Sequence, residues 1–463
     1  MTPIARCLLC PVLAAAVFAG PLPAPALAKA PTLQAAIGNP DDVKLSGSLR
    51  LRYETLDGQP RTGFNPNDEQ LAIRTTLLAE YRAAPALRIG AEIYDSRVAL
   101  EKTGGAFGAN EINALELVQA YLAADIARPF GTGSKATLQL GRMMLNLRSR
   151  RLVAADDYRN TTNGYTGLRA DLTLRDGTTA TLFYTLPQLR LPDDLPSVRR
   201  EQVRRDRESF DLRLWGGLIA RPATLAGATA ELGYVRLQER DWAGHPTRNR
   251  NLHTVSARLI REPRPGRLDF EGEGMFQFGS VRASTAPAAP RLPVAAWFVH
   301  ADAGYTFPGP ARLRLSVEYD RASGDGPGRG FGRFDTLFGM RRADLAPSGI
   351  YNAIGRANIE TPGLRVEAAP SRRWDAMATY HALWLASRSD AFSTTGVRDA
   401  SGTSGRFAGH QIDARLRYWV VPQALRAEIN AVWLAKRGFL HDAPNAPATG
   451  DTHYLATGLT ASF

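Results

Sequence analysis

The chain has 463 residues, of which 44% are hydrophobic and 22% charged, and its formal net charge is +12. This balance excludes a disordered chain and a helical membrane protein, and the length is large for one compact soluble domain. Only five of the 57 basic residues are lysine, so 57 − 5 = 52 are arginine. Arginine pairs bidentately with carboxylates, which favours an anionic partner, although a GC-rich genome would give the same bias.

The N-terminus has the pattern of a secretory signal peptide. Arg6 precedes a short apolar run, CLLCPVLAAAVFAG, and the ALA at 26–28 fits a small-residue cleavage site. Both cysteines, Cys7 and Cys10, lie in this segment, so the mature chain lacks disulfides. We predict three segments: a signal peptide over 1–28, a short periplasmic segment over 29–44 and the main domain over 45–463.

The rest of the chain alternates apolar and polar residues with a period of two, which predicts β-strands. The clearest segments are LSGSLRLRYET (45–55), LDFEGEGMFQF (268–278), ARLRLSVEYD (311–320) and HQIDARLRYWV (410–420). Such segments run for about 10–14 residues, the length that a tilted membrane strand requires. The last segment, HYLATGLTASF, must pair with the first strand near 45–56 to close a barrel.

The connections between these segments are of two kinds. Eight are short, near 82–86, 125–134, 175–178, 220–224, 261–266, 308–311, 368–372 and 420–424. Nine are long and polar, near 57–68, 98–110, 147–163, 187–206, 240–250, 280–294, 323–362, 389–406 and 437–452. The sequence therefore predicts an all-β fold, a transmembrane antiparallel β-barrel of about 18 strands with short periplasmic turns and long extracellular loops, in the outer membrane of a Gram-negative bacterium. The part over 350–362 is either loop or an extension of the strand ending near Ala369.

The polar face of the strands is predicted to line a water-filled lumen rather than a packed core. Arginines in the lumen register are Arg50, Arg52, Arg74, Arg88, Arg213, Arg312, Arg314, Arg415 and Arg417. Acids in that register are Glu54, Glu92, Asp269, Glu271, Glu273 and Glu318. Two interpretations remain open: the charges neutralise one another in ion pairs, or they form a path for an anion.

Two runs of the chain resemble signature regions of the alginate export family of outer-membrane porins. They are LGRMMLNLRSRRLVAADDYRNTTNGYTGLR (140–169) and FGRFDTLFGMRRADLAPSGIYNAIGRANIETPG (331–363). The resemblance extends from about residue 45 to the end and implies an 18-stranded monomeric barrel with an arginine-rich lumen that exports an anionic polysaccharide. Its runs add these residues to the candidate path: Arg142, Arg148, Arg150, Arg151, Asp156, Asp157, Arg159, Arg169, Asp335, Arg341 and Arg342.

The predicted function is thus an outer-membrane porin that exports an acidic polysaccharide such as alginate or a related polyuronate. A general anion-selective porin, or an uptake channel for small organic acids or acidic oligosaccharides, is the first alternative, and a structural or adhesion barrel is the second. Serial arginines bind carboxylates weakly enough to favour conduction. The long third loop carries the Arg148–Arg159 cluster, which we predict to narrow the barrel.

No other chemistry is indicated. The seven histidines lack metal-ligand spacing, and no serine is placed for an outer-membrane lipase, so we predict no cofactor, no metal and no enzymatic activity. Calcium bound by Asp320 or Asp325 is a minor alternative. Expected partners are the anionic solute, lipopolysaccharide, periplasmic export proteins and the barrel-assembly machinery, which would read the terminal Phe463; nucleic acid is not expected.

Overall fold

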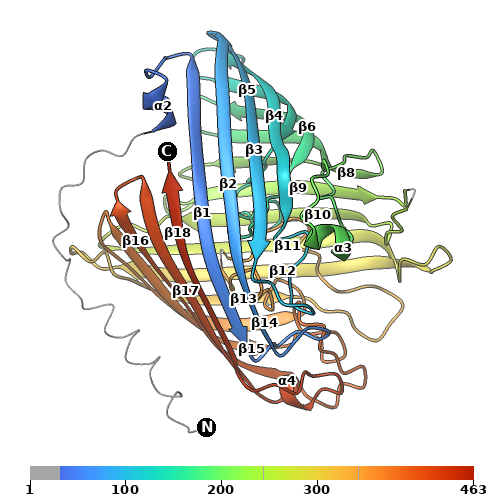
Figure 1. Ribbon diagram of the computed structural model, residues 1–463. Coiled ribbons are helices and arrows are strands. Elements are labelled where there is room, and N and C mark those ends of the chain that lie inside the picture. Colours follow the sequence, from blue (N-terminus) through green and yellow to red (C-terminus); the bar gives the residue numbers. More distant parts are fainter. Residues whose placement is uncertain (1–31, 243, 343) are drawn as a thin grey trace.

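The computed structural model describes residues 32–242, 244–342 and 344–463. The predicted signal peptide lies outside the described residues, as do residues 29–31 of the predicted periplasmic segment. Within the described part, eighteen strands form one antiparallel sheet in which each strand pairs with its chain neighbours (Figure 1). The last strand, β18, pairs with β1, so the sheet closes into a barrel.

The strands have the following bounds: β1 Val43–Asp57, β2 Asn67–Ala84, β3 Leu87–Ala99, β4 Asn113–Ala127, β5 Lys135–Met143, β6 Tyr165–Thr173, β7 Thr179–Pro187, β8 Leu212–Arg221, β9 Thr229–Glu239, β10 Asn251–Arg261, β11 Arg267–Arg282, β12 Arg291–Thr306, β13 Arg314–Ala322, β14 Ile359–Ser371, β15 Trp374–Trp384, β16 Phe407–Val421, β17 Leu425–Lys436 and β18 Thr452–Ser462. Three short helices accompany them: α2 Leu33–Ala36, α3 Leu195–Arg199 and α4 Phe439–Asp442. None of the described helices meets the length and hydropathy that a membrane crossing demands.

The predicted division into long loops and short turns is confirmed. Nine long connections lie at one end of the barrel and eight short ones at the other, as expected for 18 strands. The uncertain part near 350–362 is loop up to residue 358, and β14 begins at Ile359.

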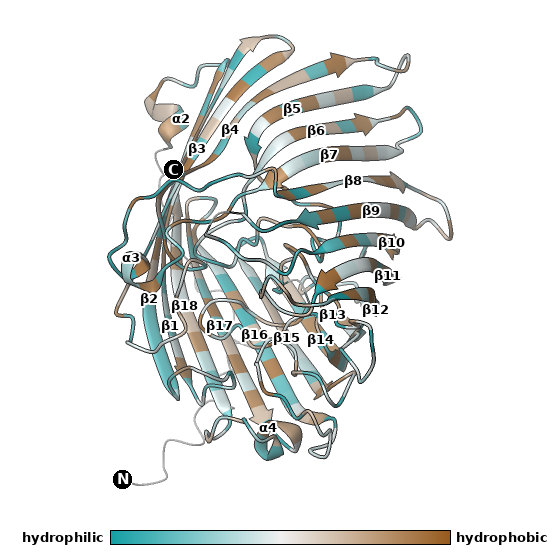
Figure 2. Ribbon diagram, turned by 90° about the vertical axis from the view of Figure 1, so that its right-hand side faces the viewer, coloured by the Kyte–Doolittle hydropathy of each residue, from teal (hydrophilic) through white to brown (hydrophobic). Residues whose placement is uncertain are grey.

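The two faces of the strands follow the alternation in the sequence (Figure 2). On β1, Arg52 and Glu54 are 4% and 0% exposed, whereas Leu51 and Tyr53 are 39% and 37% exposed. A closed barrel satisfies its backbone hydrogen bonds internally and can therefore lie in lipid. The exposed row of apolar side chains is its lipid-facing surface.

The prediction that Arg213 faces the lumen is wrong. Arg213 shares a face of β8 with Trp215, while Leu214 points inward and is fully buried. The reason is that apolar side chains fill the lumen beside this strand, so its inward positions are leucines rather than arginines.

Part of the lumen is a packed core rather than open water, which differs from the prediction. Figure 2 shows loops crossing the interior of the barrel. Their apolar side chains form a buried cluster with inward residues of the wall, including Leu147, Val153, Ile350, Leu214 and Leu237. Burial of such side chains stabilises the loops by roughly 25 cal/mol per Å² of apolar surface.

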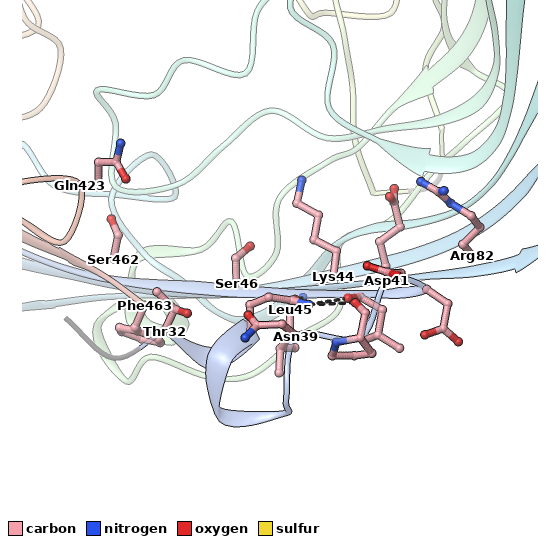
Figure 3. A pocket seen from close by; sticks show the side chains of 15 residues that line it. Thr32, Asn39, Asp41, Lys44, Leu45, Ser46, Arg82, Gln423, Ser462 and Phe463 are labelled. Atoms are coloured by element: carbon pink, nitrogen blue, oxygen red, sulfur yellow. Dashed lines mark hydrogen bonds between the residues drawn. The ribbon is translucent and has the colours of Figure 1, made fainter. Parts of the chain in front are cut away.

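The barrel closes at its periplasmic end through Phe463. Gly47 N donates to Phe463 O at 2.9 Å, and Phe463 N donates to Gly47 O at 3.0 Å. A Cβ atom at position 47 would lie 2.5 Å from the Phe463 ring, so glycine makes room for the ring. The Gln34 side chain binds the start of β1, accepting from Leu45 N at 2.8 Å, beside a cavity of about 650 Å³ (Figure 3).

Candidate functional site

Two long loops, L3 (residues 144–164) and L7 (residues 323–358), fold into the barrel and meet there. Val153 of L3 and Phe338 of L7 form a parallel β-bridge, and Ala154 N donates to Phe338 O at 3.1 Å. The apolar residues behind this bridge are buried in L7: Leu345, Ala346, Ile350, Tyr351 and Ile354. We call the two loops together the plug, because they narrow the lumen as one packed unit.

The tip of L3 rests on two arginines of β1 and β2. Arg50 donates to the backbone oxygens of Asp157 and Arg159 at 2.9 and 2.6 Å, and Arg74 donates to Arg159 O at 3.2 Å. Neither arginine forms an ion pair within the described part of the chain. A neutral carbonyl does not cancel the charge of a guanidinium group, so both arginines remain sources of positive potential.

These two arginines are also directly opposite each other in the sheet. Arg50 pairs with Arg74 in the β1–β2 register, and Arg52 lies two positions further along β1. Like charges directly opposite each other destabilise a sheet. We call Arg50, Arg52 and Arg74 the basic wall.

Arg52 differs from its neighbours because an acid neutralises it. Arg52 Nε donates to Glu54 Oε1 at 2.8 Å, and both side chains are buried. Glu54 also accepts from Tyr454 at 2.9 Å and from Ile350 N of L7 at 3.2 Å. The pair therefore fastens L7 to β1 and β18.

The opposite side of the barrel carries acids. Glu271, Asp302 and Glu318 lie directly opposite one another on β11, β12 and β13, and Glu273 and Asp320 flank His300 in the next row. We call these five acids the acidic wall: Glu271, Glu273, Asp302, Glu318 and Asp320. Arginines from the plug and from neighbouring strands neutralise much of this charge.

Arg151 of L3 is the main link between the plug and the acidic wall. It is 4% exposed, forms ion pairs with Glu271 and Glu273, and binds both oxygens of Asp344 in L7 at 2.8 Å. Arg356 of L7 pairs with Asp344 as well. Removing one member of such a buried network leaves uncompensated charges, so Arg151 holds L3 in place.

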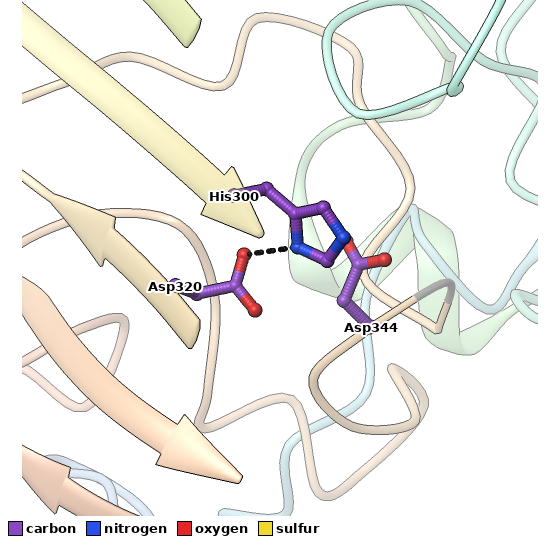
Figure 4. Close-up of side chains that lie close together, drawn as sticks. All are labelled: His300, Asp320 and Asp344. Atoms are coloured by element: carbon purple, nitrogen blue, oxygen red, sulfur yellow. Dashed lines mark hydrogen bonds and ion pairs between the residues drawn. The ribbon is translucent and has the colours of Figure 1, made fainter. Parts of the chain in front are cut away.

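His300 and Asp320 of the wall lie beside Asp344 of L7 (Figure 4). His300 Nδ1 is 3.0 Å from Asp320 Oδ1, and one ligand atom from each residue lies within 4.8 Å of the others. Such a trio resembles a metal site, but Asp344 already binds the guanidinium groups of Arg151 and Arg356. Because these cations repel a metal ion, we interpret the trio as an electrostatic contact between wall and plug.

On the other side of L7, Arg342 forms an ion pair with Asp413 of β16 and donates to Asn430 of β17 at 2.8 Å. Tyr351 donates to Gln411 of β16 at 2.6 Å. L7 is therefore fixed to strands on both sides of the barrel seam.

A groove of about 580 Å³ opens towards the periplasmic end, and ligand sites in proteins have similar volumes. Its charged lining residues are Arg312, Arg314, Arg415, Arg417, Glu367 and Asp375. Arg415 and Arg417 share one acid, Asp375, at 3.2 and 2.8 Å, and Arg312 has no ion pair within the described residues. The groove is therefore a basic mouth below the plug.

A second basic cluster lies where the plug, with Arg159 and Arg341, meets two other long loops, with Arg61 and Arg190. Arg159 and Arg190 both donate to Asn110 Oδ1, at 3.0 and 2.6 Å. Burial lowers the pKa of Arg190 and Arg341 to about 10, and the charge of Arg159 adds to this effect on both. Arg61, whose NH2 donates to Ile350 O at 2.8 Å, is buried close by. Arg190 and Arg341 therefore stay cationic at neutral pH.

The predicted path residues do not form one site. Those with an ion pair to an acid are Arg52, Arg88, Arg142, Arg148, Arg150, Arg151, Arg159, Arg169, Arg314, Arg342, Arg415 and Arg417. The predicted acids Asp156, Asp157, Glu318 and Asp335 are partners of Arg159, Arg150, Arg365 and Arg250. Without an ion pair among the described residues are Arg50, Arg74, Arg312 and Arg341.

Among the arginines absent from the predicted set are three in or beside the plug, Arg61, Arg190 and Arg356. They lie in loops with no alternation, so their direction could not be derived from strand periodicity. Arg190 and Arg356 lie in two of the three longest polar loops, and this position was the signal available in the sequence for placing them near the plug.

The comparison with family models finds the alginate export family, matching residues 41–450. The comparison with curated proteins finds no match. Solved structures of outer-membrane proteins from Pseudomonas aeruginosa share the fold. OccK3 (OpdO) has 15% identity and a TM-score of 0.56, with 91% of this chain and 96% of that one covered. OpdK has 12% identity and a TM-score of 0.57, with 91% and 99% covered. OccK2 (OpdF) in complex with glucuronate has 14% identity and a TM-score of 0.56, with 91% and 97% covered.

Proposed function

Because the chain belongs to the alginate export family, whose members are outer-membrane porins, we propose that it exports an acidic polysaccharide, such as alginate or a related polyuronate. The observation that carries this proposal is the pair Arg50 and Arg74, which face each other at the plug and whose hydrogen-bond partners among the described residues are carbonyl and amide oxygens. A sheet tolerates such a pair at a cost in stability, and an anionic solute would offset that cost.

The path would run between three basic regions. A polymer would first meet the periplasmic groove at Arg415 and Arg417, then the basic wall at Arg50 and Arg74, then the loop cluster around Arg341. A carboxylate about 4 Å from a guanidinium gains roughly 1 kcal/mol in water and about 4 kcal/mol in a narrow, less polar passage. Several sites of this strength in series favour conduction over trapping.

Neutralised arginines have a different role in this proposal. Arg151, Arg342 and Arg52 are buried in ion pairs that fasten the plug, so they shape the passage without attracting the solute. The acidic wall, whose charges arginines neutralise, would leave Arg50 and Arg74 as the stronger attraction for the polymer.

Uptake of a small acidic sugar is the second candidate. The plug fills much of the lumen, and one structurally similar porin, OccK2 (OpdF), was solved in complex with glucuronate. The same arginines would serve either solute. The predicted monomeric state and the predicted periplasmic export partners stay predictions.

Single-channel recording with purified protein in a planar bilayer tests the proposal. We expect an anion-selective reversal potential and reversible block by oligomers of mannuronate or guluronate, but no block by a neutral maltooligosaccharide of equal length. Block by glucuronate alone would favour the uptake channel. Cation selectivity, or a barrel that does not conduct, would contradict both.

We also propose that Phe463 is read by the barrel-assembly machinery. Deleting it should lower the amount of heat-modifiable barrel in outer-membrane fractions, while refolding in detergent is affected much less. Phe463→Tyr, which keeps an aromatic ring against Gly47, is the matched control. Wild-type levels of the deletion protein in the membrane would refute this role.

A further inference from the structure

The outer face of the barrel carries a row of polar residues along β8 to β12, close to the end with the long loops. In the sheet register Arg213 lies opposite Gln238, Gln238 opposite Asn251, and Asn251 opposite Ser280. Arg236 and Arg291 lie diagonally beside this row. We call these six residues the outer basic patch: Arg213, Arg236, Gln238, Asn251, Ser280 and Arg291.

The three arginines of the patch have no acidic partner within the described part of the chain. Arg236 donates to Asn251 Oδ1 at 3.3 and 3.2 Å, and Arg291 donates to Ser280 Oγ at 2.8 Å. The Nε atom of Arg213 is buried without a hydrogen bond. On the same belt Arg321 and Arg406 share Glu360, and Arg282, opposite Arg291, pairs with Asp241, so the lack of an acidic partner is a property of the three patch arginines.

The patch lies where lipid headgroups meet the barrel. One row nearer the middle of the membrane are the rings of Trp215, His253 and Phe278, and Arg236 lies in this row between Trp215 and His253. Further down the same strands, exposed apolar residues such as Leu232 and Val255 face the lipid chains. Aromatic rings mark the membrane interface, so Arg236 among them and Arg213 and Arg291 just above them are at the height of the outer-leaflet headgroups.

We propose that the outer basic patch binds the phosphate groups of a phosphorylated glycolipid in the outer leaflet, of the lipid A type. Arginine forks bind phosphate bidentately, and Arg213 and Arg236 approach from neighbouring strands. Ser280 accepts from Arg291 and keeps its own proton to donate, and the Asn251 amide donates as well. These groups suit the ester oxygens and sugar hydroxyls next to a phosphate.

The lipid is favoured over a soluble anion because of where the patch lies. A free phosphate would contact only the arginines, whereas the lipid also places its acyl chains against the exposed apolar rows of β8 to β10. The patch is on the outer face of the wall, so this proposal is independent of the solute that passes through the lumen.

Binding to purified, folded protein in detergent tests the proposal. Native mass spectrometry would compare bisphosphorylated lipid A, dephosphorylated lipid A and inorganic phosphate. We expect bound bisphosphorylated lipid A, at least tenfold weaker binding after dephosphorylation, and no competition from millimolar phosphate. Equal binding of the dephosphorylated lipid, or full competition by phosphate, would overturn the proposal.

Variants locate the site. Arg213→Gln with Arg236→Gln and Arg291→Gln should weaken lipid A binding at least tenfold, whereas Arg221→Gln with Arg261→Gln should leave it unchanged. Arg221 and Arg261 share the strands β8 and β10 and the outer face with the patch, but lie at the periplasmic rim. Equal losses in both variants would refute the patch as the site.

Two further measurements guard against indirect effects. Arg213→Lys with Arg236→Lys keeps the charge and loses the fork, so it should bind with intermediate affinity even if the triple glutamine variant does not fold. Channel selectivity should be unchanged in every patch variant, and a changed selectivity would mean that the arginines act on the lumen instead.

Discussion

The basic wall and the acidic wall hold the same loop by opposite means. On β1 and β2 the wall supplies arginines and L3 supplies backbone oxygens, so the charge of Arg50 and Arg74 stays in the lumen. On β11 the wall supplies acids and L3 supplies the Arg151 guanidinium, so the charges cancel. The difference shows that an arginine's partner, more than its presence in the lumen, decides whether it can attract an anion.

We expect the largest effect from replacing Arg151, which links the plug to the acidic wall and is neutralised there. Arg151→Gln leaves Glu271, Glu273 and Asp344 buried without their main partner, and breaking a buried pair costs roughly 3–5 kcal/mol. We expect a lower temperature for loss of the heat-modifiable form and a larger, noisier conductance as L3 is released. Arg150→Gln is the control, because that side chain is 39% exposed. Equal behaviour of the two variants would show that Arg151 does not hold the loop.

The next effect concerns the arginines without acids. Arg50→Gln combined with Arg74→Gln should lower the anion-to-cation permeability ratio at least about fivefold, since even one lost charge is worth roughly 1 kcal/mol in water. Stability should change little, because the loss of like-charge repulsion offsets the loss of the hydrogen bonds to L3. The control is Arg169→Gln, whose arginine is paired with Asp171 at 2.6 Å. An unchanged reversal potential in the double variant would remove the basic wall from the path.

A smaller effect should follow from removing one carboxylate of the acidic wall. Asp302→Asn leaves Arg314 with Asp269 and Glu367, so the barrel should keep its stability within about 1 kcal/mol. Anion preference should rise slightly, because Arg314 is then less neutralised. A fall in anion preference, measured by reversal potential, would contradict the assignment of opposite roles to the two walls.

The smallest expected effect is a dependence of heat stability on pH, caused by Glu111 in a loop above the basic wall. Burial of Glu111, whose backbone oxygen accepts from Asn160 of L3 at 2.9 Å, raises its pKa from 4.5 to about 7. A raised carboxyl pKa contributes stability that is complete below 4.5 and is lost as the pH rises through about 7. Heat stability should therefore fall between pH 5 and 8, and Glu111→Gln should flatten this slope while Glu101→Gln in the same loop should not. A slope that persists in Glu111→Gln would assign it to another group.

The barrel could be predicted because its information is local. A period of two, short turns and long loops define 18 strands and their faces without any distant contact. The exception is instructive: Arg213 was placed in the lumen because polar residues usually line it, but the inward Leu214 packs in the buried cluster with L3 and L7. The polarity of a side chain therefore predicts that it faces the lumen only where the lumen contains water.

The candidate site could be predicted only as a set of residue types. Arg50 and Arg151 look alike in the sequence, and what distinguishes them is distant: Arg50 meets carbonyl groups 107 and 109 positions away, and Arg151 meets acids 120, 122 and 193 positions away. No periodicity predicts where a loop of some twenty residues will fold. The family resemblance pointed to the right loops, since L3 and L7 carry its two runs.

The parallel bridge between Val153 and Phe338 has a consequence for the order of assembly. L3 begins after β5 and L7 after β13, and Ile350 N reaches Glu54 across 296 positions. Contacts of such sequence separation form late, because a long loop must close before they can contribute. The passage therefore acquires its width and its charge only when distant parts of the chain have come together, and not as each hairpin of the wall forms.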